Sequence, residues 1–123
     1  MNLRDYGRTV LEANQGDIIL ISFPFSNVTD YKVRPAIVIS NNLYNTSTED
    51  VVVLAMTSNI NNMKYKIKIN NNDLLSGTLP LDCAIRVDKP YSLIKSKILK
   101  IQAKIKTEKF LIIIEKINAL INP

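Results

Sequence analysis

The chain lacks histidine altogether and has one cysteine, Cys83, among its 123 residues. Without histidine, the most common acid–base catalyst near neutral pH is missing, and Ser-His-Asp and Cys-His catalytic devices are excluded. One cysteine cannot form an intramolecular disulfide, and these residue types are too few for a zinc site. We therefore expect no metal, no cofactor and a reducing, cytoplasmic setting.

Long apolar runs are also missing. The longest are Ile18–Ile21, Val51–Met56 and Phe110–Ile114. All are far below the ~18–20 residues that cross a bilayer. Residues 1–16 lack the apolar core of a secretory signal, so we expect no membrane contact. The length fits a single domain, residues 1–123, with residues 1–15 as an N-terminal arm.

Charge is distributed unevenly along the chain. Residues 1–63 carry four basic and six acidic side chains, whereas residues 64–123 carry twelve basic and five acidic ones. A positive surface of this kind favours a polyanionic partner, either nucleic acid or an acidic polypeptide. Alternatively, alternating lysines protect exposed sheet edges against aggregation, or they reflect genome composition.

Alternating and β-rich segments predict six strands, at about residues 17–25, 35–41, 51–58, 64–69, 82–89 and 97–106. We expect loops at residues 26–33 and 70–80, and a loop with room for one helical turn at 41–50. Six short strands with polar connections predict a small, strongly bent antiparallel barrel. The chain has no βαβ alternation, no P-loop and no dinucleotide-binding glycine motif.

The C-terminal segment, residues 107–121, has helical periodicity, and Thr107 is expected to cap the helix. The apolar positions predicted to form one buried face are Phe110, Ile113, Ile114, Ile117, Leu120 and Ile121. Leu111 and Ile112 widen this face. Either the helix is unusually buried, or its second side meets another subunit.

Arg34 stands at the expected entrance of the second strand. Pro35 disfavours helix at Arg34, and the branched run that follows is typical of a buried strand. An arginine held there can direct two donors at a phosphate or a carboxylate. The alternative is a strand-end arginine that pairs with a surface carboxylate.

Several segments, in order, resemble the PemK/MazF family of toxin endoribonucleases from toxin–antitoxin pairs. They are Gly16–Leu20, Phe23–Phe25, Arg34–Asn41, Tyr44-Asn45, Asp50–Ser58 and Arg86–Lys89 followed by Leu93. The resemblance implies an SH3-like antiparallel barrel with a C-terminal helix, commonly a homodimer. It also implies a toxin that cleaves single-stranded RNA, often mRNA, without metal and is bound by an acidic antitoxin. Any contact with DNA would be made through that antitoxin.

By the same resemblance, the catalytic arginine falls on Arg34 and the catalytic threonine on Thr57. Ser58 and Arg86 fall on motif positions as RNA contacts, and Lys32 is expected to join them. The products would be a 2′,3′-cyclic phosphate or 3′-phosphate and a 5′-hydroxyl. A guanidinium and a hydroxyl suit this reaction, because charge builds on the phosphate oxygens during 2′-hydroxyl attack.

Alternatives remain at each position. Thr57 is of a type common at strand ends, Arg86 could form only a structural ion pair, and Cys83 is expected to be a small buried apolar residue. Leu81-Asp82-Cys83 replaces the lysine-proline-serine of PemK-like relatives, so Asp82 could repel phosphate or orient Arg86. Other functions for such a barrel are a non-enzymatic toxin that inhibits gyrase and a nucleic-acid binder without activity.

Overall fold

The computed structural model describes residues 10–24 and 31–123. Two α-helices and seven strands form its regular structure, with short 3₁₀ turns at Asn71–Asp73 and Lys95–Lys97. The strands are β1 Asp17–Pro24, β2 Tyr31–Val38, β3 Asp50–Thr57, β4 Lys66–Ile69, β5 Leu74–Gly77, β6 Cys83–Ile94 and β7 Ile98–Ile105. The helices are α1 Asn42–Ser47 and α2 Thr107–Ile121.

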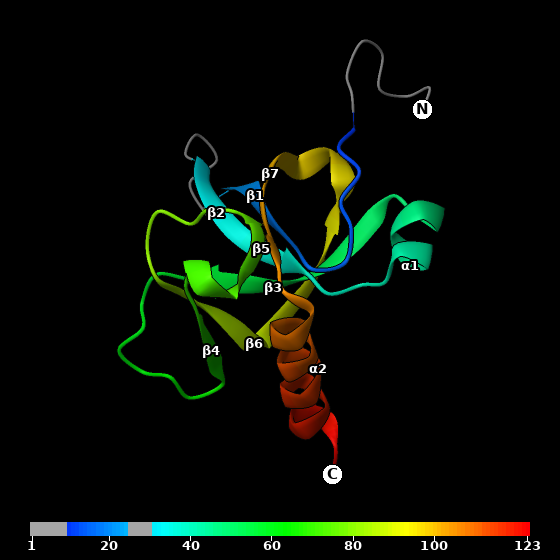
Figure 1. Cartoon of the computed structure of the whole chain (residues 1–123). Coiled ribbons are helices and arrows are strands. Elements are labelled where there is room, and N and C mark those ends of the chain that lie inside the picture. Colours follow the sequence, from blue (N-terminus) through cyan, green and yellow to red (C-terminus); the bar gives the residue numbers. More distant parts are fainter. Residues whose placement is uncertain (1–9, 25–30) are drawn as a thin grey trace.

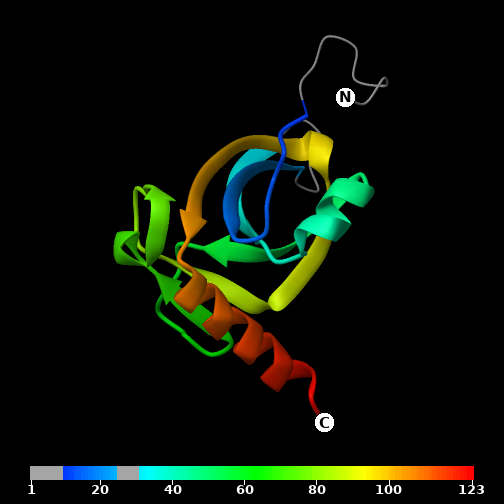
Figure 2. The same ribbon diagram turned by 45° about the vertical axis from the view of Figure 1, so that its right-hand side comes forward.

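All seven strands belong to one antiparallel sheet in the order β4-β6-β3-β2-β1-β7-β5. The sheet curls into an incomplete barrel, and α2 leaves it at one side (Figures 1 and 2). The predicted fold class, mainly β with a C-terminal helix, is confirmed. The predicted strand 51–58 corresponds to β3, which lies inside the sheet between β2 and β6.

The two faces of the sheet carry separate apolar clusters, because successive residues of a strand point to opposite sides. One cluster gathers Ile18, Ile37 and Leu54 with Phe110 and Ile113 of α2. The other gathers residues from the alternate positions of the same strands, among them Ile19, Ile21, Ala36, Val38, Val51 and Val53. The sheet is thus buried on both faces over its central strands, which explains the continuous apolar run of β3.

Strand boundaries depart from the prediction at several places. Strand β2 begins at Tyr31, not at residue 35, because Val33 pairs with Ser22 of β1. Strand β6 continues to Ile94, past Pro90, because pairing with β4 ends at Arg86 and leaves the outer edge free for proline. The loop predicted at 41–50, with room for one helical turn, does contain the short helix α1, and the Asn41 side chain accepts a bond from the Tyr44 backbone amide.

The predicted loop at 70–80 contains an additional strand, β5, paired with β7. Its last residue, Gly77, has a φ of +76° and approaches β7 so closely that a Cβ would lie 2.3 Å from the Gln102 carbonyl oxygen. The expected strand at 64–69 begins at Lys66, and residues 64 and 65 form a turn. The predicted N-terminal arm has neither helix nor strand over residues 10–15, and residues 1–9 lie outside the described part.

Helix α2 has the predicted bounds, but its burial differs from the prediction. Only Phe110 and Ile113 are buried, and Ile117 is partly buried. The remaining apolar side chains are exposed, with Ile121 at 70%. The N-cap is Lys106 without a side-chain hydrogen bond, so the expected cap by Thr107 is wrong. No helix among the described residues is long and apolar enough to span a membrane.

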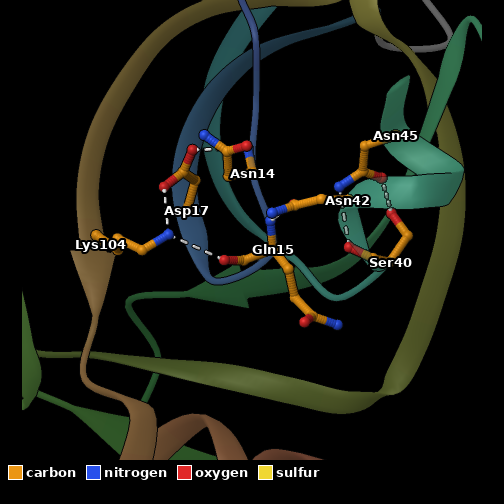
Figure 3. A network of polar contacts seen from close by, with 7 residues as sticks. All are labelled: Asn14, Gln15, Asp17, Ser40, Asn42, Asn45 and Lys104. Carbon is orange, nitrogen blue, oxygen red and sulfur yellow. Dashed lines mark hydrogen bonds and ion pairs between the residues drawn. The ribbon is translucent and has the colours of Figure 1, made fainter. Parts of the chain in front are cut away.

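A polar network fastens residues 14 and 15 to the sheet (Figure 3). The buried carboxylate of Asp17 accepts a bond from the Asn14 amide at 2.8 Å and lies 3.4 Å from Lys104 Nζ. Lys104 Nζ also donates to the Gln15 carbonyl at 3.1 Å. The backbone amide of Gln15 donates a hydrogen bond to Asn42 Oδ1 at 2.8 Å, and this bond connects the segment to α1.

We predict that Asp17→Ala lowers the free energy of unfolding by about 1.5–3 kcal/mol, the usual range for hydrogen bonds to a charged group. The variant removes the acceptor of the Asn14 amide and the counter-charge of Lys104 from a buried position. Urea unfolding measures the change.

The matched control is Asp82→Ala, because Asp82 pairs with Lys68 at 3.6 Å with half of its side chain exposed. Its effect should stay within about 0.5 kcal/mol. Equal losses in the two variants would contradict a special role for the Asp17 network.

Candidate functional site

Arg34 lies within strand β2, opposite Ile21 of β1. The prediction that it marks the strand entrance is therefore wrong, because β2 begins three residues earlier. Its side chain is half-buried, and it shares a face of the strand with the buried Ala36. Strand β2 pairs with β3 over Ala36–Val38, whereas its pairing with β1 continues to Tyr31. The position of Arg34 is therefore set by β1.

Thr57 is brought to the same face as Arg34 by the strand register. Ala36 pairs with Ala55 in the last pair of the β2–β3 ladder, and Arg34 and Thr57 each lie two residues beyond that pair. Since side chains alternate along a strand, both residues point to the face that carries Ala36. We call the face of β2, β3, β4 and β6 with Arg34 and Thr57 the site face.

The Thr57 hydroxyl is held by the turn that follows β3. Its Oγ1 accepts a hydrogen bond from the Asn59 amide at 3.1 Å. Lys66 of β4 donates from Nζ to the Asn59 carbonyl at 3.1 Å. A hydroxyl that accepts one bond retains its own hydrogen for another acceptor, so Thr57 can donate to a ligand on the site face.

Arg86 reaches the site face from strand β6. Thr57 pairs with Ala84, and Arg86 follows Ala84 by two residues on the same side. Between the pairs Met56–Ile85 and Leu54–Pro90 the register shifts, so residues 86–89 stand opposite Ala55 alone. Such bulges redirect side chains and are frequent beside active sites.

Asp88, within this bulge, pairs with Arg86. One carboxylate oxygen lies 3.6 Å from Arg86 Nη2, and both side chains are about one-third exposed, at 37% and 31%. Arg86 Nε and Asp88 Oδ1 are buried and make no hydrogen bond within the described part of the chain. Asp82 forms its ion pair with Lys68, with 3.6 Å between Oδ2 and Nζ. The ion-pair partner of Arg86 is therefore Asp88 and not Asp82.

Two lysines that the sequence-based assignment omitted also lie on the site face. Lys66 pairs with Arg86, and Lys68 pairs with Ala84 beside Thr57. Lys32 and Arg34 occupy alternate positions of β2, so Lys32 belongs to the same face, where it is exposed. The sequence shows that Lys66 and Lys68 alternate with apolar residues, but only the ladder between β4 and β6 shows which residues lie beside them.

Ser58 is exposed and directly follows the end of β3, next to Thr57. The structure therefore places Arg34, Thr57, Arg86 and Lys32 on one face and Ser58 at its border. Such a surface offers several cationic and hydroxyl donors to an anionic ligand. Among the described residues, no group of three histidine, cysteine, aspartate or glutamate side chains could hold a metal ion.

Two groups of strand β6 that could carry a proton keep it at neutral pH. Burial raises the pKa of Tyr91, which pairs with Val53, to about 12. Burial, followed by the charge of Asp82, raises the pKa of the Cys83 thiol to about 11. Cys83 is buried in the apolar cluster under α2. It is the small apolar residue that the sequence predicted.

A family described as PemK-like, MazF-like toxin of type II toxin-antitoxin system matches residues 14–121. The chain belongs to this family of toxins, as the resemblance of its segments predicted. No curated protein sequence matches the chain.

Solved structures of the same family have the same fold. The MazE-MazF complex (Form-II) from Deinococcus radiodurans superposes with a TM-score of 0.73 at 18% identity, covering 89% of this chain and 96% of that one. An endoribonuclease in complex with its cognate antitoxin, from a mycobacterial species, gives 0.70 at 18%, covering 87% and 92%. Mycobacterium tuberculosis toxin MazF-mt6 gives 0.65 at 11%, covering 84% and 93%. These likenesses confirm the predicted MazF-type barrel.

We predict that the Cys83 thiol reacts with iodoacetamide about a hundredfold more slowly at pH 8 than a free thiol does, because only the thiolate is nucleophilic. A pKa raised from 9.0 to about 11 lowers the thiolate fraction by that factor. The rate should rise up to about pH 11, and unfolding in urea should restore the ordinary rate. Rapid labelling of the folded protein at pH 8 would contradict the assignment.

Proposed function

We propose that the protein is the toxin of a type II toxin–antitoxin pair and a metal-independent endoribonuclease acting on single-stranded RNA, mRNA included. One observation carries the proposal. Arg34 and Thr57 each lie two residues beyond the last pair of the β2–β3 ladder, Ala36–Ala55, and by alternation their side chains belong to one face of the sheet. Membership in a toxin family and the endoribonuclease named among its structural neighbours support the same activity.

In the proposed reaction, the 2′-hydroxyl oxygen attacks the adjacent phosphorus, and the bond from phosphorus to the 5′-oxygen breaks. A 2′,3′-cyclic phosphate forms, or a 3′-phosphate after hydrolysis, and the leaving oxygen takes a proton to become the 5′-hydroxyl. The 2′-hydroxyl proton passes to water or a carboxylate. Arg34 binds two phosphate oxygens with its planar fork, and Thr57 donates its hydroxyl hydrogen to the developing charge.

Arg86, Lys32 and Ser58 are proposed as RNA contacts beside this pair. Arg86 and Lys32 are cations on the same face, and Ser58 borders Thr57. We assign Asp88 as a positioning residue, because its carboxylate restrains the Arg86 guanidinium from within the bulge. A partly exposed ion pair of this kind contributes little to stability, so we propose that Asp88 serves to orient Arg86.

We further propose an acidic antitoxin as the protein partner, a cytoplasmic location, and DNA contact only through that antitoxin. Antitoxins accompany the toxins in two of the structural neighbours described above. A net charge of +5 favours an acidic partner.

We predict that Arg34→Ala and Thr57→Val each lower the rate of RNA cleavage by about 10²–10³, the cost of removing one donor from a developing oxyanion. Purified protein is incubated with RNA in EDTA, and fragments are mapped with their 5′-end chemistry. Arg34→Lys should recover only part of the rate, because an ammonium lacks the bidentate fork.

Two matched variants serve as controls. Thr57→Ser keeps the hydroxyl and should retain most of the activity, and Lys100→Ala changes an exposed lysine on β7. Equal cleavage by wild type, Arg34→Ala and Thr57→Val would remove both residues from the mechanism. No cleavage by any form, with arrested growth and intact cellular RNA, would favour the non-enzymatic toxin.

We propose a homodimer and predict that light scattering at micromolar concentration gives twice the 13.9 kDa protomer mass. The apolar side of α2 favours association, because Leu111 is 58% and Ile112 41% exposed. Leu111→Glu should weaken the dimer without lowering the free energy of unfolding of the protomer. A protomer mass for wild type would contradict the proposal.

A further inference from the structure

Lys68 of strand β4 lies near the candidate catalytic residues, although the proposed reaction gives it no role. It pairs with Ala84 of β6, and Ala84 pairs with Thr57 of β3. Two inter-strand spacings, about 10 Å, therefore separate the backbones of Lys68 and Thr57. Because paired residues of neighbouring strands point to the same side of a sheet, both side chains belong to the site face. Figure 1 shows β4 at the end of the sheet, beside β6.

Asp82, which immediately precedes β6, pairs with the ammonium group of Lys68. Its Oδ2 lies 3.6 Å from Lys68 Nζ, and the side chains of Lys68 and Asp82 are 50% and 52% exposed. An ion pair with this much solvent around it contributes little to stability. It therefore opens at little cost when another anion approaches the lysine.

Two other cations on the site face have different partners. Lys66 Nζ donates to a backbone carbonyl at 3.1 Å. Arg86 pairs with Asp88, and each of these two residues has a buried polar atom, Arg86 Nε and Asp88 Oδ1. The pair of Lys68 and Asp82 is the more exposed of the two ion pairs. A phosphate can thus displace the carboxylate from Lys68 more easily than from Arg86.

We propose that Lys68 binds a phosphate of the RNA other than the one that is cleaved, and that Asp82 competes with the RNA for Lys68. The inference rests on the proposed function and adds to it a substrate contact and the competitor of that contact. In the free protein, the Asp82 carboxylate occupies the place that a phosphate oxygen takes in the complex. RNA binding exchanges one anion for another at Lys68, so the carboxylate lowers the affinity for RNA.

This exchange of anions affects how binding depends on salt. A phosphate that binds Lys68 releases a cation from the RNA, but the displaced carboxylate attracts a cation in turn. The two effects oppose each other, so the contact adds little to the salt dependence in the wild type. Without the carboxylate, one phosphate contact to a single strand contributes fully, a change of about −0.7 in the slope of log K against log salt concentration.

The test is fluorescence anisotropy with a short random-sequence RNA whose riboses are 2′-O-methylated, so that it binds but is not cleaved. We expect Asp82→Asn to bind about fivefold more tightly than wild type at low salt, the upper range for release of an exposed ion pair. The slope should be steeper by about 0.7. Lys68→Ala should bind about threefold more weakly than wild type, because it loses the contact and keeps the carboxylate.

The double variant Lys68→Ala/Asp82→Asn separates competition for the lysine from simple repulsion of the RNA. If Asp82 acts through Lys68, removal of its charge changes little once the lysine is absent. The double variant should then bind within about twofold of Lys68→Ala. An effect of Asp82→Asn that is equally large in both backgrounds would mean that the carboxylate only repels RNA, and it would overturn the proposal.

Glu115→Gln and Lys100→Ala are the matched controls for the change of charge. Both residues are exposed, Glu115 on α2 and Lys100 on β7 opposite Leu20, away from the site face. Each variant should bind RNA within about twofold of wild type, and melting curves verify that all variants fold. Binding by Asp82→Asn that is no tighter than binding by Glu115→Gln would contradict the competition.

Cleavage kinetics distinguish an effect on binding from an effect on chemistry. Asp82→Asn should lower KM and leave kcat unchanged, because the carboxylate does not touch the reacting atoms. A fall in kcat would assign Asp82 to the reaction, and loss of binding to sequences with one particular base would make it a base-reading residue; either result overturns the inference.

The binding and cleavage assays test the two proposals separately. Because the 2′-O-methylated RNA cannot be cleaved, a failed nuclease assay leaves the binding result intact. Absence of RNA binding by every form, Asp82→Asn included, would overturn the inference, while cleavage of unmodified RNA would still test the proposed function.

Discussion

The antiparallel register of β2, β3 and β6 is the constraint on which the candidate site depends. A slip of one residue between β2 and β3 would turn Arg34 to the opposite face from Thr57, because side chains alternate with a period of two. Burial on both faces prevents such a slip. Ile37 and Leu54 belong to the cluster under α2, while Ala36, Val38 and Val53 belong to the other cluster. Any shift would exchange the two sets and leave both clusters badly packed.

Apolar packing thus determines where polar chemistry can occur. The face that carries Ile19, Ile21 and Ala36 is apolar over β1 and the middle of β2, and it becomes polar at Arg34 and Thr57. The same register adds Arg86 and two lysines from β4. Hydrophobic burial fixes the strands, and the strands carry cationic groups to one surface without a dedicated loop. This arrangement lets a chain without histidine assemble donors for an anionic ligand.

Much of the fold follows from the sequence, since period-two patterns and a helical C-terminal segment predict a small β-barrel with a terminal helix. Strand β5 could not be predicted, because its residues 74–77 include a glycine and have little alternation of their own. The strand exists because Gly77 fits closely against the backbone of β7. The second half of β6 could not be predicted because it contains Pro90, and a proline usually argues against a central strand. It is tolerated here because β4 pairs with β6 only as far as Arg86, which leaves that edge of β6 unpaired at Pro90.

The candidate site was predictable in residue types but not in arrangement. Arg34 and Thr57 follow from the resemblance to toxin endoribonucleases. Their common face depends on which strands pair and in what register, and the sequence does not reveal this because α1 and its flanking turns, residues 39–49, separate β2 from β3. The Arg86–Asp88 pair depends on a bulge, for which Arg86-Val87-Asp88-Lys89 carries no local signal. The burial predicted for α2 was wrong for most of its apolar residues. Helical periodicity identifies an apolar face, but it does not distinguish a face packed against the protein's own core from an exposed one.

The position of β1 has a consequence for biosynthesis. This strand is flanked by β2 on one edge and by β7, Ile98–Ile105, on the other. A chain emerging from the ribosome can form the ladder to β2 early, but the opposite edge of β1 stays bare until β7 has left the exit tunnel. Bare edges invite pairing with other strands, and long-range pairing is slow. The nascent chain therefore carries an unfinished sheet until β7 becomes available to pair with β1.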